Sequence, residues 1–284
     1  MAALTLSYNV FKEVLEANGF SVVTFFDSVH FGLDSACNLE PIKSLQEKYN
    51  TQDKDKIKLT PYSLLKRVSI NTKLELEYPE LALLKKLDSV ISGDYLINEV
   101  EFALDICSAH NERIIRLRKF IDDHLLYRTK EKKQFCYHHF RALNDTDYFA
   151  NRILRGGSLI VYSRRPSKMA ELPCVHIEMR LRNSKDLKAI GIYSLKELIS
   201  FCPETFWNKR LDLRALKLNQ LGQLVDPIKT GLSSSSYLRR GQKQYAEFHS
   251  AQHLLSHYPQ YATAYVPITS RRMFESRLKT ALEE

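Results

Sequence analysis

A strict alternation of side chains over residues 174–181, CVHIEMRL, constrains the fold more than any other feature of this sequence. In an extended strand its four aliphatic and thioether side chains face one way, and the remaining side chains, most of them polar, face the other. Residues 97–106 and 74–78 repeat the pattern, again with acidic residues on the polar side. Three strands of this kind predict a sheet with one apolar face and one acidic face.

Helical and extended patterns share the rest of the chain. We expect a charged loop at 45–57, strands at 21–33 and 158–162, and helices at 5–19, at 111–126 and from Pro79 to Leu87. From residue 187 onward the pattern is mainly helical. These elements predict an α+β fold with a largely antiparallel sheet, flanking helices and a mainly helical C-terminal part. We place one domain at residues 1–205 and a basic C-terminal region at 206–284.

Charge indicates the kind of partner. The formal net charge is +9, and residues 206–284 hold 12 Lys and Arg against 6 Asp and Glu. Such an excess favours a polyanion, and we expect DNA. The chain has no run of 18 apolar residues and no signal-peptide pattern, so we expect no membrane contact. Its five cysteines lack any CxxC pair, which is typical of a reduced cytoplasmic protein without structural zinc.

The acidic residues of the three strands predict a metal site. The polar sides carry Glu75, Glu77, Glu101, Asp105 and Glu178. If the strands are neighbours, these carboxylates repel one another unless a hard cation such as Mg²⁺ or Mn²⁺ lies among them. We expect Glu101, Asp105 and Glu178 to bind it, with His176 as a further ligand. The alternative is that the acids simply face solvent. His249, His253 and His257 recur at helical spacing, which favours a polar helix face over a second metal site.

Tyr162 ends the expected strand at 158–162, and Arg164, Arg165 and Lys168 follow it closely. A phenol attacks phosphate poorly until a metal polarises the phosphoryl group, and cations can hold the neighbouring backbone phosphates. This combination predicts a tyrosine nucleophile that acts on DNA. The alternatives are a strand aromatic that packs in the core and a solvated basic loop.

The order of these segments resembles the gene II-type replication initiators of filamentous phages and related rolling-circle plasmid initiators. The family's three core strands are matched by LINEVE (96–101), SLIVYSR (158–164) and CVHIEMRL (174–181). NSKDLKAIGIYSLKELISF (183–201) resembles the segment that follows in the family, and KLELEYPELALLKKL (73–87) the one that precedes. Each motif is short, so the specificity lies in their order across residues 70 to 201. The family's Arg before each strand acid is replaced here by Glu99 and His176.

The resemblance implies a rolling-circle DNA replication initiator in a bacterial host cell. Tyr162 would cut one strand at a phage or plasmid origin, single-stranded or supercoiled, leaving a 5′-phosphotyrosine and a 3′-OH, and would later rejoin the strand. A host helicase or polymerase would be a further partner. The residues expected to bind DNA are Arg164, Arg165, Lys168, Arg180, Arg239, Arg240 and Lys243. The alternative is a DNA-binding or regulatory relative that does not cut. An RNA-binding sheet is disfavoured, because we expect no aromatic pair on the acidic face to stack bases.

Overall fold

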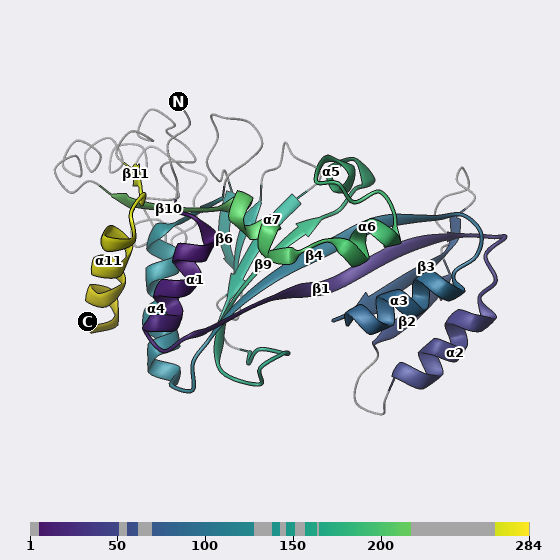
Figure 1. The fold of residues 1–284 in the computed structure, drawn as a ribbon, viewed down its shortest axis with the longest axis horizontal. Coiled ribbons are helices and arrows are strands. Elements are labelled where there is room, and N and C mark those ends of the chain that lie inside the picture. The colour runs from purple at the N-terminus through teal and green to yellow at the C-terminus, as the bar shows by residue number, and fades with distance from the viewer. Residues whose placement is uncertain are drawn as a thin grey trace, which may run out of the picture.

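The computed structural model describes residues 6–50, 56–61, 70–127, 138–142, 146–150, 157–163, 165–216 and 265–283. Its centre is an eight-stranded sheet in the order β2-β3-β1-β4-β9-β8-β7-β6 (Figure 1). Every neighbouring pair in this sheet is antiparallel. The prediction of an α+β fold with a largely antiparallel sheet is therefore confirmed.

The long strands β1 and β4 lie side by side in the middle of the large sheet. The strands are β1 (Ser21–Asp34), β2 (Ile57–Pro61), β3 (Ile70–Glu77), β4 (Tyr95–Cys107), β6 (His138–Ala142), β7 (Thr146–Ala150), β8 (Gly157–Tyr162) and β9 (Cys174–Leu181). A second, three-stranded sheet has the order β11-β10-β5. Its strands are β5 (Leu125–Tyr127), β10 (Leu211–Leu216) and β11 (Tyr265–Pro267).

The described helices gather at the two ends of the large sheet and along one of its faces (Figure 1). They are α1 (Tyr8–Ala17), α2 (Glu40–Tyr49), α3 (Leu81–Val90), α4 (Asn111–His124), α5 (Ser184–Ala189), α6 (Leu195–Ser200), α7 (Pro203–Arg210) and α11 (Arg271–Glu283). The sequence of α1 explains where this helix begins and which of its sides is buried. The Ser7 side chain caps it by accepting a hydrogen bond from the Val10 amide, and Phe11, Val14 and Leu15 form its buried stripe.

The apolar side of β4 faces α7. Phe102 stacks on Phe206 with ring centroids 4.0 Å apart, and Trp207 Nε1 donates a hydrogen bond to the Ala103 carbonyl at 3.1 Å. Because side chains alternate along a strand, Glu101 and Asp105 lie on the opposite face of the sheet. Packing of α7 thus fixes which face carries the acidic residues.

At one end of the sheet, α11 packs against α1 and α4. Phe274 stacks on Phe11 at 5.4 Å, and both rings are fully buried. The last helix therefore shares the core of the first one. The boundary that we place after residue 205 stays a prediction.

Two expectations about secondary structure need correction. The charged segment 45–57 is not a loop throughout, because α2 continues to Tyr49 and β2 starts at Ile57. The helical C-terminal part falls largely on residues 217–264, outside the described residues, and the described remainder contains β10 and β11 as well as α11. None of the helices in the described ranges combines the length and hydrophobicity that a bilayer-spanning segment needs.

Candidate metal centre and tyrosine

Three neighbouring strands bring the predicted residues together. Asp105 of β4 pairs with His176 of β9, and Tyr162 of β8 pairs with the same His176. Directly paired residues of antiparallel strands point to the same side of the sheet. Tyr162, His176 and Asp105 therefore form a row across one face, and Glu178 and Glu101 lie on that face beside them.

The acidic residues Asp105, Glu101 and Glu178 on this face are buried, so the alternative that they simply face solvent does not apply to them. Glu101, Asp105 and Glu178 expose only 7%, 0% and 2% of their area. Charged groups at this depth need partners, because burial in low dielectric penalises an isolated charge by several kcal/mol. Each of these carboxylates therefore needs a cation or a proton to balance its charge.

Asp27, His176 and Glu178 form the group best placed to hold a cation. One ligand atom from each lies within 4.8 Å of the other two. Within the described residues, Asp27 Oδ1 and His176 Nε2 are buried without a hydrogen-bond partner. Glu178 Oε2 lies 3.6 Å from His176 Nε2. Two carboxylates and one imidazole suit Mn²⁺, and the carboxylates also suit Mg²⁺, so the residues fit a divalent cation.

Asp27 was not among the ligands predicted from sequence. It lies on β1 where the register with β4 shifts, since Phe26 pairs with Phe102 and Ser28 with Glu101. Asp27 is the extra residue of this β-bulge, and bulges re-aim side chains. Alternation cannot place a residue at a bulge. The available signal was a lone acid inside the apolar stretch TFFDSVHF (24–31).

Asp105 orients the histidine rather than joining the group. His176 Nδ1 lies 2.6 Å from Asp105 Oδ1 and donates to it, which leaves Nε2 directed at Glu178. A carboxylate on the second nitrogen fixes the ring and its tautomer. Burial lowers the pKa of His176, but its hydrogen bond to Asp105 and the close Glu178 carboxylate outweigh this and raise the pKa to about 9. Without a metal, the protonated His176 supplies the balancing charge.

Arg180 pairs with both glutamates that the sequence suggested as ligands. Its Nε lies 2.7 Å from Glu101 Oε1 and also forms an ion pair with Glu178. Burial and the nearby charge of Glu178 raise the pKa of Glu101 to about 8. The pKa of Glu178 is lowered, because the nearby His176 and the hydrogen bond from Arg180 outweigh burial. Glu178 thus belongs to the candidate centre, while Glu101 is paired with Arg180 beside it.

Tyr162 lies directly on the candidate centre. Its ring stacks on His176 with centroids 4.5 Å apart and planes inclined by 26°. Burial, followed by the negative charges of Asp27, Glu178 and Asp105, raises the pKa of the Tyr162 phenol. A phenol in this environment needs a nearby cation before it can lose its proton at neutral pH.

The residues predicted to bind DNA have different environments. Arg165 is exposed. Lys168 Nζ lies 3.7 Å from Asp27 Oδ1, and Arg180 is held by its two glutamates. Arg164, Arg239, Arg240 and Lys243 lie outside the described residues. Of the described basic residues predicted to bind DNA, Lys168 and Arg180 are therefore engaged with carboxylates, and Arg165 is exposed.

The acidic face also carries aromatic rings, contrary to our expectation. Phe25 of β1 pairs with Ala103, which places it on the same face. Its ring centroid lies 6.4 Å from that of His176 and 6.5 Å from that of Tyr78. A row of rings therefore runs from Tyr162 through His176 and Phe25 to Tyr78.

Comparison with solved structures gives a distant similarity. The chain is similar to the structure of a rolling circle replication initiator protein from Geobacillus stearothermophilus, with 12% sequence identity and a TM-score of 0.39. The alignment covers 70% of this chain and 89% of the other. No protein-family model matches the sequence. No curated protein matches it either.

Proposed function

We propose that this chain is a rolling-circle DNA replication initiator that nicks and rejoins one DNA strand through Tyr162. The observation that carries the proposal is the stacking of Tyr162 on His176, whose Nε2 faces the buried carboxylates of Asp27 and Glu178. The resemblance of the ordered strand motifs to replication initiators supports the same tyrosine. The cell compartment that fits this function is the bacterial cytoplasm.

The reaction is a transesterification. The Tyr162 oxygen attacks the phosphorus of the scissile phosphodiester, an O–P bond to tyrosine forms, and the P–O3′ bond breaks. The phenol proton leaves, and the departing O3′ gains a proton to become a free 3′-OH. Attack of a 3′-OH on the phosphotyrosine reverses these bonds and rejoins the strand.

The side chains around Tyr162 have separable tasks. Asp27, His176 and Glu178 would hold Mn²⁺ or Mg²⁺, and Asp105 keeps the His176 ring in place. When bound, the cation would polarise the phosphoryl group and stabilise the phenolate. Arg165, which is exposed and follows Tyr162 by three residues, would contact a neighbouring phosphate.

Replacing Tyr162 by Phe tests the proposal, because it removes only the hydroxyl. With Mn²⁺ or Mg²⁺, the wild-type protein should convert supercoiled plasmid that carries its origin to nicked circles and form a denaturation-resistant protein–DNA adduct. Tyr162→Phe should do neither, while its affinity for DNA stays nearly unchanged. Tyr193→Phe is the matched control, because Tyr193 is exposed, and it should cut like the wild type.

Two results would overturn the assignment. Cleavage by Tyr162→Phe at the wild-type rate would exclude this tyrosine as nucleophile. Binding without any cleavage by the wild type, on its own origin and with either metal, would favour the DNA-binding or regulatory alternative.

A further inference from the structure

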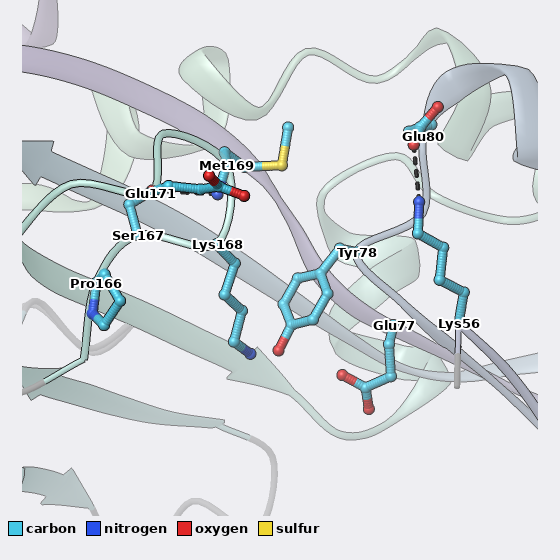
Figure 2. Close-up of a pocket in the computed structure, with 9 residues that line it drawn as sticks. All are labelled: Lys56, Glu77, Tyr78, Glu80, Pro166, Ser167, Lys168, Met169 and Glu171. Carbon is cyan, nitrogen blue, oxygen red and sulfur yellow. Dashed lines mark hydrogen bonds and ion pairs between the residues drawn. The ribbon is translucent and has the colours of Figure 1, made fainter. Parts of the chain in front are cut away.

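A pocket of about 730 Å³ opens beside the candidate metal centre. It lies between the β8–β9 loop and the corner where β3 meets α3, and Figure 2 shows the side chains that line it. The loop contributes Lys168, Met169 and Glu171, and the corner contributes Glu77 and Tyr78. The volume is in the range of pockets that bind small organic groups.

Lys168 joins this pocket to the metal centre. Its Nζ lies 3.7 Å from the centroid of the Tyr78 ring and 3.7 Å from Asp27 Oδ1. The Tyr78 amide also donates a hydrogen bond to the Asp27 carbonyl at 2.9 Å. The pocket and the metal centre therefore share one wall.

The walls of the pocket are held in place by local hydrogen bonds. Ser167 pairs with Leu172 through its amide at 2.8 Å, and its Oγ accepts from the amides of Met169 and Ala170. On the other wall, Tyr78 has a φ of 47°, a conformation rare for a bulky residue. Residues held in such conformations cluster at functional sites.

The charges of the lining exclude a phosphate as the occupant. Glu77, Glu80 and Glu171 outnumber the two lysines of the pocket. Both lysines already face a carboxylate, because Lys56 lies 2.9 Å from Glu80 and Lys168 lies near Asp27. A phosphate would meet net repulsion here.

The same lining suits a flat, neutral group that carries N–H donors. The Tyr78 ring, with Lys168 Nζ near it, offers an aromatic surface, and the half-exposed Met169 side chain on the opposite wall offers a polarisable thioether (Figure 2). The carboxylates of Glu77 and Glu171 can accept hydrogen bonds from exocyclic amino groups, as carboxylates do from cytosine N4.

We propose that this pocket binds one unstacked base of single-stranded DNA, next to the nucleotide whose phosphate reaches Tyr162, and that it prefers bases with an amino group. The inference rests on the proposed function in taking single-stranded DNA as the ligand. Cytosine, adenine and guanine each present an amino group to the carboxylates, and thymine presents none.

Binding measured without cleavage tests the pocket directly. The probes are oligo-dC, oligo-dT and an abasic strand of equal length, and the full chain is titrated in EDTA with fluorescence anisotropy as the readout. The wild type should bind oligo-dC about tenfold more tightly than the abasic strand, as expected for one stacked base. It should bind oligo-dT more weakly than oligo-dC.

Variants then assign the preference to the pocket. Tyr78→Asn introduces a residue that tolerates the positive φ at this position. Met169→Ala shortens a side chain that is half exposed, so this variant should fold like the wild type. Both should bring the ratio between oligo-dC and the abasic strand close to one. Glu77→Gln combined with Glu171→Gln should remove the preference over oligo-dT. Tyr193→Ser is the control for a lost surface aromatic and should leave both ratios intact.

The outcomes separate this inference from the proposed function. If both ratios in Tyr78→Asn and Met169→Ala equal those of the wild type, the pocket does not bind a base, whether or not Tyr162 cuts. If the ratios collapse as expected but the wild type never nicks, the base pocket stands and the nicking function is wrong.

Discussion

His176 connects every part of the candidate site at the scale of single residues. Its Nδ1 donates to Asp105, its Nε2 faces Glu178, and its ring stacks on Tyr162. A protonated imidazole neutralises the carboxylates around it, and a neutral imidazole can bind a metal. Protons and divalent cations therefore compete for this residue.

Stability of the metal-free protein should fall as pH rises from about 6.5 to 9. The folded-state pKa is raised to about 9 for His176 and to about 8 for Glu101, so the folded state holds more protons than the unfolded chain in this window. Stability is then fully present below the unfolded pKa and is lost as pH rises through the folded pKa. Each group contributes at most about 1.4 kcal/mol per pH unit. Urea unfolding in EDTA at a series of pH values measures the slope.

His176→Gln supplies the control for this slope. Glutamine cannot take up a proton, so the free energy of unfolding should decline less steeply between pH 6.5 and 9. The decline that remains should come from Glu101. Mn²⁺ should stabilise the wild type at the upper end of the window, because it binds the deprotonated residue. A slope that is equally steep in His176→Gln would show that this histidine is not protonated in the folded state.

At the scale of elements, alternation predicted the regular strands and failed where a strand is irregular. It placed Glu178 and His176 on one side of β9 and Asp105 on one side of β4, and it identified Tyr162 at the end of β8. Alternation did not identify Asp27 as a ligand, because the bulge in β1 shifts the register by one residue and so breaks the period-two pattern. Alternation alone does not show which strands are neighbours, since pairing joins β4 to β9 across 66 intervening residues. The expectation that Glu101 and Glu178 share a metal site required these two strands to be adjacent, and they are.

Helix α7 is the element whose packing holds β4 in place, so loss of its main aromatic contact should destabilise the fold. Phe206 is buried and stacks on Phe102. Phe206→Ala should lower the free energy of unfolding by about 3–5 kcal/mol, through lost burial and the cavity left behind. The neighbouring Trp207 is the one tryptophan of the chain, so its fluorescence reports the unfolding transition in urea.

Thr205→Ala, one residue earlier and exposed, should change stability by less than about 0.5 kcal/mol. The acidic residues lie on the other side of β4, so the folded fraction of Phe206→Ala should still bind Mn²⁺. A loss below about 1 kcal/mol in Phe206→Ala would mean that α7 contributes little to holding the strand.

At the scale of the whole molecule, two basic residues of the site are occupied by acidic partners. Arg180 and Lys168 are engaged with carboxylates of the candidate centre. These two cations of the site are therefore balanced by its own carboxylates, although the chain carries a net charge of +9. Apart from Arg165, attraction of the DNA backbone would come from basic residues elsewhere, and residues 206–284 hold 12 of the 42 Lys and Arg against only 6 acids.

We therefore expect Arg239, Arg240 and Lys243 to supply phosphate contacts, and salt dependence tests this. Deleting the C-terminal region would not be a clean test, because α11 buries Phe274 and Leu278 in the core and its loss would disturb the fold. Replacing all three by Ala should instead reduce the slope of log Kobs against log salt for single-stranded DNA by about 2, since each phosphate contact contributes about 0.7. Arg271→Ala is the matched control: its guanidinium already pairs with Glu13 and Glu275, so the slope should hardly change. An unchanged slope in the triple variant would show that these three residues do not touch the DNA backbone.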